Sequence, residues 1–226
     1  MNNIIIIPAF NPPKSFIKFI EHLLNITEEK ILIIDDGSVP QIKLSNTPRL
    51  SLLRNKVNMG KGYSLKKGFA FSIENDFTHC VTIDADSQHD PIFVKNFFKI
   101  DANISLVIGN REFDNSMPFH RKVSNQLTSK LISILTSHNL LDSQCGFRRY
   151  RLEDVQNYNY LENGFQFESE IIITLLKNNH TLSHLKISTI YGNEKSFINN
   201  FTDTLKFIRL IIRYFFKSLV SYFILL

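Results

Sequence analysis

Short apolar runs alternate along the chain with longer segments in which apolar positions recur at helical spacing. Each apolar run ends in turn residues. We expect strands at Ile4–Ile7, Ile31–Ile34, Ser51–Leu53, Cys80–Ile83 and Ile104–Ile108. We expect helices over Ser15–Leu24, over Tyr63–Ile73 and after Pro91. Continuous apolar strands joined by helices predict an α/β fold, with a mostly parallel sheet flanked by helices.

Polar side chains follow three of the predicted strands at the point where each strand ends. Phe10 and Asn11 follow the first strand, Asp35 and Asp36 follow the second, and the segment Asp84–His89 follows the fourth. Ligands of open parallel sheets bind outside the carboxyl ends of the strands. We therefore expect these three clusters to line one crevice.

Asp84 and Asp86 are the main candidates for binding a metal ion. They are two residues apart, so in an extended chain their carboxylates project to the same side, and Gln88 repeats the spacing. Carboxylate and amide oxygens suit Mg²⁺ or Mn²⁺, which would fasten a nucleoside diphosphate and stabilise charge on a leaving diphosphate. An acidic turn with a helix N-cap is the alternative for this segment.

The glycines Gly60, Gly62 and Gly68 look like a phosphate-binding loop, but their spacing fits neither the dinucleotide-binding pattern nor the P-loop pattern. The spacing therefore disfavours NAD binding and P-loop chemistry. Lys61, which lies between two of these glycines, is still placed to approach a phosphate or a base. His89 adjoins the acidic segment, and a contact with the metal site competes with a purely structural role.

The composition of the 226-residue chain narrows the function classes. With 43% hydrophobic and 21% charged residues, the chain can bury one core and is neither disordered nor a disulfide scaffold. The net charge of +5 fits a polyanionic partner, but the basic residues do not interleave with a recognition motif, so we expect no nucleic-acid partner. Cys80 and Cys145 lack metal-ligand spacing, and we expect Cys145 to be a small packed residue.

The two ends of the chain indicate a cytosolic protein at a membrane surface. The N-terminus lacks the charged segment and the long apolar run of a signal peptide. Near residue 201 the acids almost vanish, and at helical spacing four cations fall in one narrow stripe of an otherwise apolar helix: Lys206, Arg209, Arg213 and Lys217. These charges disfavour a membrane span. We expect a domain over residues 1–200 and an amphipathic helix over residues 201–226.

Such a helix suits the headgroup region of an anionic membrane surface. Docking of the same helix on the domain, or on a second copy of the chain, is the alternative. The expected location is therefore peripheral, at the cytoplasmic face of the membrane.

Taken in order, eight segments resemble the family 2 inverting glycosyltransferases, in particular the branch that includes dolichyl- and polyprenyl-phosphate sugar transferases. The segments are Pro8–Asn11, Asp35–Ser38, Asn58–Gly62, Asp84–Pro91, Gly109–Arg111, Asp142–Arg148, Phe167–Glu170 and Tyr191–Ser196. The resemblance covers about residues 4–205. It implies a fold of the glycosyltransferase A type and a nucleotide-diphosphate sugar as the donor.

The resemblance also implies roles for individual residues. Pro8, Phe10 and Asp36 would contact the nucleotide, with Lys61 nearby, while metal and diphosphate would be held by Asp84, Ala85, Asp86 and Gln88. The acceptor or its sugar would be placed by Arg111, Arg121 and Ser124, and a basic loop containing Lys195 and Ser196 would close over the diphosphate. Asp86, Arg111, Arg121 and Lys195 would carry catalysis. Pro12 stands where the family usually has an acid, which puts base preference or affinity in question.

The type of acceptor decides which catalytic groups are needed. A polyprenyl phosphate is already anionic and needs positioning cations more than a general base. A saccharide hydroxyl would need a base, and the candidates are Asp142, Glu168 and Glu170. Helix capping by Asp142 and a solvated helix face for the two glutamates are the alternatives for these residues.

We therefore expect a metal-dependent inverting glycosyltransferase that moves a sugar from a nucleotide-diphosphate sugar to a polyprenyl phosphate at the cytosolic membrane face. The first alternative is a glycosyltransferase that acts on a saccharide hydroxyl in polysaccharide assembly. The second is a non-catalytic nucleotide-sugar binding module, which the proline at position 12 suggests.

Overall fold

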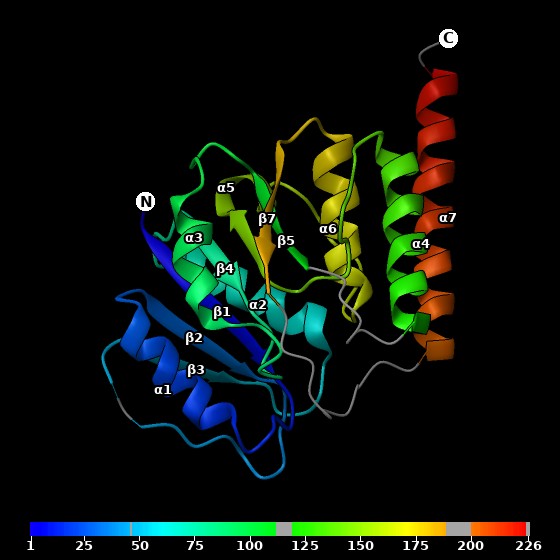
Figure 1. Cartoon of the computed structure of the whole chain (residues 1–226). Helices are drawn as coiled ribbons and strands as arrows, with labels where there is room; N and C mark the ends of the chain where they lie inside the picture. The colour runs from blue at the N-terminus through cyan, green and yellow to red at the C-terminus, as the bar shows by residue number, and fades with distance from the viewer. Residues whose placement is uncertain (46, 112–118, 189–199, 225–226) are drawn as a thin grey trace.

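The computed structural model describes residues 1–45, 47–111, 119–188 and 200–224, although the side chains of residues 119–121, 200–201 and 218–224 lie outside the description. In the described residues, one sheet is flanked by helices, and two long helices lie beyond the helices that cover it (Figure 1). The strands are β1 Asn3–Ala9, β2 Lys30–Asp35, β3 Leu50–Arg54, β4 His79–Thr82, β5 Leu106–Arg111, β6 Arg148–Arg151 and β7 Leu182–Ile187.

The sheet has the strand order β3-β2-β1-β4-β6-β5-β7. Its neighbouring strands run parallel except in the two pairs that β6 makes with β4 and β5. The expected mostly parallel sheet is confirmed. From β1 the chain builds outward through β2 to β3 and then returns to the other side of β1 as β4. This reversal of direction lies between β1 and β4, where open parallel sheets form a ligand crevice.

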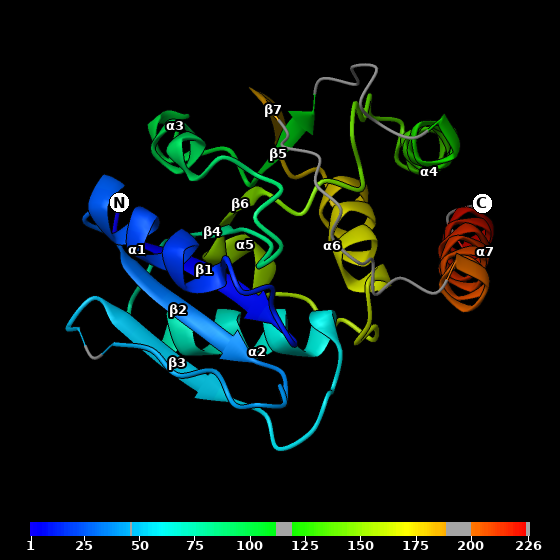
Figure 2. The same ribbon diagram turned by 60° about the horizontal axis from the view of Figure 1, so that its bottom comes forward.

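Helices cover both faces of the sheet (Figure 2). Their bounds are α1 Phe16–Ile26, α2 Lys61–Glu74, η1 Pro91–Phe93 (a 3₁₀ turn), α3 Val94–Lys99, α4 Phe119–Thr136, α5 Leu152–Val155, α6 Gln166–Lys177 and α7 Asn200–Ile224. Helices α1 and α3 lie on one face, and α2, α5 and α6 lie on the other. Helices α4 and α7 pack on α6 and on each other.

The core is built on strands that are buried on both faces. The four isoleucines of β1, Ile4–Ile7, are at most 1% exposed, because helices cover both sides of this strand. Helix α2 lies directly on β1: a Cβ atom on Gly68 would fall 2.7 Å from a methyl carbon of Ile6. The glycine therefore allows α2 to pack closely against β1.

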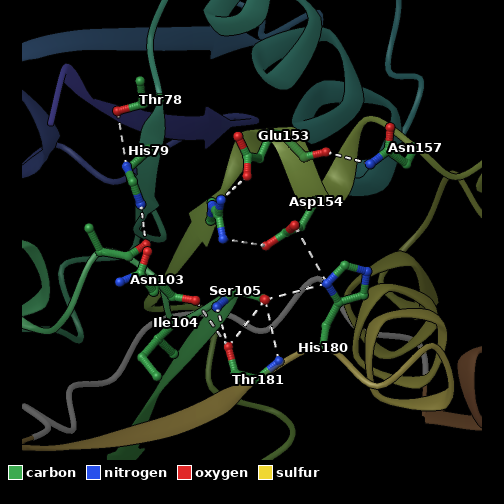
Figure 3. A network of polar contacts seen from close by, with 12 residues as sticks. Thr78, His79, Asn103, Ile104, Ser105, Glu153, Asp154, Asn157, His180 and Thr181 are labelled. Carbon is green, nitrogen blue, oxygen red and sulfur yellow. Dashed lines mark hydrogen bonds and ion pairs between the residues drawn. The ribbon is translucent and has the colours of Figure 1, made fainter.

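A polar network closes the edge of the sheet opposite the predicted crevice (Figure 3). His79 Nε2 lies 2.9 Å from the carbonyl oxygen of Ala102, and Asp154 Oδ1 lies 3.5 Å from His180 Nδ1. The Ser105 and Thr181 hydroxyls are 3.2 Å apart. The network joins the amino-terminal ends of β4, β5 and β7, so His79 and His180 have a structural role.

Helix α7 is docked on the domain by one side. Leu210 is fully buried, and the hydroxyl groups of Tyr214 and Thr174 lie 2.7 Å apart. Arg213 donates to Glu170 at 2.8 Å and lies 3.1 Å from a carboxylate oxygen of Glu162. Docking on the domain was the alternative for this helix. Arg213 consequently leaves the expected basic stripe and faces the protein, because it pairs with the buried Glu170 on α6 and the half-buried Glu162 before α6.

Candidate functional site

The loop after β2 is fixed by two buried aspartates. Asp36 accepts hydrogen bonds from Asn55 Nδ2 at 2.7 Å, from the Met59 amide at 2.9 Å and from the Gly60 amide at 2.8 Å. Its neighbour Asp35 accepts from the Ser38 amide and pairs with Arg54. The Asp36 carboxylate therefore holds the loop that leads into α2. Sequence spacing gave no sign of this role, because the three donors lie 19 to 24 residues further along the chain.

The loop after β1 is joined to the loop after β2. The amide nitrogen of Asn11 donates to the Ser38 hydroxyl at 2.9 Å, and the Asn11 side-chain oxygen accepts from the Val39 amide at 2.8 Å. Asn11 has a φ of 44°, which an asparagine tolerates better than most residues. Pro8 and Phe10, at the end of β1 and just after it, are half-buried. The two predicted clusters thus lie side by side at the carboxyl ends of β1 and β2.

The acidic segment after β4 forms a tight turn. Asp86 accepts a hydrogen bond from the Gln88 amide at 3.0 Å, and Ser87 between them has a φ of 61°. Asp84, Ala85, Asp86 and Gln88 are all half-buried. Two carboxylates and one amide oxygen from this turn fit a hard divalent cation that keeps open positions for a phosphate. Within the described residues, no three His, Cys, Asp or Glu side chains are grouped as a complete metal site.

Lys61 connects this turn to α6. Its Nζ lies 2.6 Å from Asp84 Oδ1 and 2.7 Å from Glu168 Oε2. Burial alone would lower the pKa of Lys61, but the two carboxylates outweigh it and raise the pKa above the ordinary value. For Asp84, burial would raise the pKa, and the ammonium of Lys61 lowers it instead. Both groups are therefore charged, and a cation already stands against the first aspartate.

Arg111, at the end of β5, is held by a buried carboxylate. Its Nε and Nη2 donate to the two oxygens of Asp142 at 2.6 and 3.0 Å. Asn125 of α4 also donates to Asp142, at 2.7 Å. Burial would raise the pKa of Asp142, and Arg111 with Asn125 lowers it. Asp142 thus orients Arg111 and lies outside the helices, so the helix-cap alternative is wrong.

The two glutamates of α6 are buried rather than solvated. Glu168 is 7% and Glu170 1% exposed, because α6 is enclosed by α2 on one side and by α4 and α7 on the other. Glu168 pairs with Lys61 and lies 3.8 Å from Arg148 Nε. Glu170 pairs with Arg213 of α7. The expectation of a solvated helix face is therefore wrong.

Three of the expected acceptor and basic-loop residues cannot be placed at side-chain level. Lys195 and Ser196 lie outside the described residues, and Arg121 falls in α4, but its side chain is also outside the description. Ser124, on the same helix, is exposed, and its carbonyl oxygen accepts from the Thr128 hydroxyl. Among the residues near this site, the structure joins Arg111 of β5 and Asn125 of α4 through the carboxylate of Asp142.

Two further residues have the roles of packed groups. His89 is 5% exposed with its ring 5.5 Å from that of Phe147, and burial lowers the pKa of His89 to about 4. Its Nδ1 has no hydrogen-bond partner within the described part of the chain. Cys145 is fully buried, and burial raises the pKa of its thiol to about 12, so the expected packing role is confirmed.

The sequence of the chain matches a known protein family. The profile described as Glycosyl transferase family 2 matches residues 4–159, which is more than half of the chain. The chain belongs to glycosyltransferase family 2.

Curated relatives of this family 2 glycosyltransferase include two enzymes named for dolichyl phosphate. One is the UDP-N-acetylglucosamine–dolichyl-phosphate N-acetylglucosaminyltransferase of Methanococcus voltae, 27% identical over 214 residues, covering 83% of this chain and 85% of that protein. The other is a dolichyl-phosphate beta-glucosyltransferase of Trichomonas vaginalis, 28% identical over 173 residues, covering 66% and 53%. An uncharacterised protein of Methanocaldococcus jannaschii is 29% identical over 207 residues, covering 84% and 89%.

Solved structures establish the fold of the family 2 glycosyltransferase. Glucosyl-3-phosphoglycerate synthase from Mycobacterium tuberculosis with UDP has a TM-score of 0.71 at 14% identity, covering 94% of this chain and 79% of that chain. The same synthase with Mn²⁺, UDP-glucose and phosphoglyceric acid has a TM-score of 0.71 at 15% identity, with the same coverage. At this identity the likeness concerns the fold alone. The expected glycosyltransferase A type fold is confirmed.

Proposed function

We propose that this glycosyltransferase moves a sugar, with inversion, from a nucleoside-diphosphate sugar to a polyprenyl phosphate at the cytoplasmic face of an anionic membrane. Two relatives are named as dolichyl-phosphate sugar transferases, which supports this class of acceptor. The proposal does not specify the nucleotide base or the sugar of the donor.

The observation that carries the proposal is that each of the three candidate general bases is already in an ion pair with a cation. Asp142 is bound by Arg111, Glu168 by Lys61, and Glu170 by Arg213. Arg111 lowers the pKa of Asp142, which makes Asp142 a weaker base, and the two glutamates are buried with their carboxylates already in ion pairs. A hydroxyl acceptor needs a base at the site, whereas a phosphate acceptor arrives ionised. The ion pairs therefore favour the phosphate.

Arg111 is the group best placed to receive that phosphate. Asp142 fixes the direction of its guanidinium, which reduces the conformational freedom lost when an anion binds. Arg121, Ser124, Lys195 and Ser196 stay predictions for the same function. Their task would be to orient the lipid phosphate and to close the basic loop over the donor.

The donor would lie across the carboxyl ends of β1, β2 and β4. Pro8, Phe10 and Asp36 would contact the nucleoside, and Asp84, Asp86 and Gln88 would hold Mg²⁺ or Mn²⁺ beside the diphosphate. A divalent ion at this position supplies stabilisation of the negative charge that builds on the leaving diphosphate. The solved structures of the mycobacterial synthase with Mn²⁺ or Mg²⁺ and UDP support this part of the proposal.

The membrane contact would be made by the outer sides of α4 and α7. These sides carry large apolar side chains that are 38–68% exposed: Val123, Leu127, Leu131, Ile134, Leu205, Ile208, Ile212, Phe215 and Phe216. Exposed cations stand on the same helices at Lys130, Lys206, Arg209 and Lys217. An apolar surface with cations fits an anionic leaflet. Within the described residues, the helices are too short or too polar to cross a bilayer.

The proposal is tested by a transfer assay with the full-length protein. Purified protein is incubated with Mn²⁺ or Mg²⁺, a panel of nucleoside-diphosphate sugars, and either a short polyprenyl phosphate or a saccharide acceptor. We expect glycosylated lipid phosphate as the product. Transfer to the saccharide alone would replace the proposal by the polysaccharide alternative, and metal-dependent nucleotide binding without any transfer would favour a binding module.

A further inference from the structure

Lys61 binds two carboxylates that come from separate parts of the chain. Its Nζ is within 2.7 Å of both Asp84 and Glu168, and its side chain is only 15% exposed. Next to it, a Cβ atom on Gly146 would fall 2.3 Å from Asp84 Oδ2 and 2.9 Å from Lys61 Nζ, so the absence of a side chain at Gly146 leaves room for this ion pair. Asp84 therefore already has a cationic partner in the protein alone.

The backbone brings Lys61 to this position through direct contact between α2 and α6. Gly60 has a φ of 97°, and a Cβ atom on Gly62 would lie 2.5 Å from Cβ of Phe167. The Tyr63 amide donates to the carbonyl oxygen of Asn163 at 3.0 Å. A lysine in the first turn of a helix faces the positive end of the helix dipole, which is unfavourable. The two carboxylates, and not the helix, therefore stabilise the ammonium here.

This cation competes with a divalent ion. Lys61 occupies Oδ1 of Asp84, and a metal bound through either oxygen would place a second cation at the same carboxylate, where the two cations repel each other. A metal that binds alone would leave Lys61 with Glu168 as its remaining carboxylate partner. A diphosphate changes this balance, because its anionic oxygens can take the place of Asp84 beside the ammonium.

We propose that Lys61 is an exchangeable counter-ion at Asp84 and Asp86, the candidate metal ligands. Lys61 neutralises Asp84 before the donor binds. When the metal coordinates Asp84, Lys61 pairs with the diphosphate instead. Metal and diphosphate then bind cooperatively. The inference rests on the proposed function for its assignment of Asp84 and Asp86 to the metal. No bond of the substrate is made or broken in this exchange.

The test measures binding and does not depend on turnover. Mn²⁺ alone is titrated into the full-length protein and into Lys61→Met, with calorimetry or electron paramagnetic resonance as the readout. We expect Lys61→Met to bind Mn²⁺ more tightly than the unaltered protein, within the roughly 5- to 150-fold span of typical couplings between two sites. Metal-free pyrophosphate should bind Lys61→Met more weakly by a similar factor, since the ammonium that would receive it is gone.

The matched control is Lys66→Met, on the same helix. Lys66 Nζ donates to the carbonyl oxygen of Tyr160 and not to Asp84 or Glu168. Its Mn²⁺ affinity should equal that of the unaltered protein. Equal affinity in Lys61→Met would overturn the inference. So would a gain that survives the added change Asp86→Asn, because the metal would then be bound elsewhere. Lys61→Gln keeps a hydrogen-bond donor without the charge and serves the same test if Lys61→Met does not fold.

Failure of this inference and failure of the proposed function give different results. An active transferase with unchanged Mn²⁺ affinity in Lys61→Met sinks only the counter-ion role. A protein that transfers no sugar to lipid phosphate, but shows the Mn²⁺ gain, keeps the counter-ion role and loses the proposed acceptor.

Discussion

Arg111 and Asp142 form a two-point ion pair, in which Nε and Nη2 of the arginine donate to separate oxygens of a fully buried carboxylate. This geometry fixes the plane of the guanidinium as well as its place. The arginine side chain is 12% exposed, so a part of it can still be reached from the surface. A positioned cation at the end of β5 is what an anionic acceptor requires.

Asp142→Asn should weaken both the fold and acceptor binding. Loss of one partner of a buried charge pair costs about 3–5 kcal/mol, and the freed guanidinium should raise KM for the lipid phosphate more than it lowers kcat. Denaturant unfolding and acceptor kinetics measure the two effects. Because the pKa of Asp142 is lowered in the folded state, the stability difference should be full at neutral pH and shrink as pH falls below about 4.

Asp154→Asn is the control for this prediction. Asp154 is also buried, but it belongs to the network at the opposite edge of the sheet (Figure 3). The Asp154→Asn substitution should lower the free energy of unfolding and leave KM for the acceptor unchanged. An unchanged KM in Asp142→Asn as well would show that Arg111 does not bind the acceptor.

Asp86→Ala should abolish transfer and leave the fold intact. The residue is half-buried in a loop, so the substitution should change stability by about 0.5 kcal/mol or less, while loss of a metal ligand should bring activity to about 1% or below. Transfer assays and thermal unfolding measure this. Asp90→Ala, in the same loop, removes the acceptor for the Ile92 amide and should retain transfer. An active Asp86→Ala protein would show that the metal assignment is wrong.

Gly146→Ala should damage the site more than the fold. The new Cβ atom would meet the Asp84 carboxylate and the Lys61 ammonium, and both charged ends would have to separate to make room. We expect a loss of transfer of about 10- to 100-fold with a thermal midpoint lowered by only a few degrees. A fully active Gly146→Ala protein would mean that the contact between Lys61 and Asp84 is not needed for function.

The apolar side of α7 should govern binding to anionic vesicles. Replacing both Phe215 and Phe216 by serine removes two large side chains that are 53% and 59% exposed, each able to contribute about 1.5–3 kcal/mol when buried in lipid. Co-sedimentation with anionic vesicles should fall by at least about ten-fold. Ile17→Ser on α1, also an exposed apolar position, should bind like the unaltered protein. Unchanged binding of the double variant would remove α7 from the membrane contact.

Truncation after Asp203 is a poorer test of the same surface. The truncation would also remove Leu210, Arg213 and Tyr214, which dock α7 on the domain. The face of α6 that α7 covers and the buried Glu170 would then be left without their partners, and instability would mask any effect on membrane binding. Substitutions on the exposed side avoid this.

The early strands were predictable because an unbroken run of apolar residues indicates a strand that is buried on both faces. The run Ile4–Ile7 is apolar at every position and is buried on both faces, so its pattern is unambiguous. Strand β6, Arg148–Arg151, was missed because three of its four residues are arginines. Two of these, Arg148 and Arg149, are at most 1% exposed. Arg149 is accommodated by donating to the carbonyls of Phe97, Ile100, Asp101 and Ile104, which no local pattern reveals.

Helix α6 was not delimited for a different reason. It is enclosed on all sides, so the periodicity of an amphipathic helix is absent from most of its sequence. The charge of the two glutamates suggested surface residues, but the enclosure of α6 makes them buried ion-pair partners. In both cases the deciding contacts come from elements that lie far away in the chain.

The sequence by itself determined the alternation of strands and helices and the acids at the strand ends, because burial and turn preference act over a few neighbouring residues. Only the tertiary structure decided the partners of those acids: Lys61 against Asp84 and Glu168, Arg111 against Asp142, and Arg213 against Glu170. A charge inside a protein must be compensated by whichever opposite charge the fold brings within a few ångströms, and sequence spacing does not encode that distance.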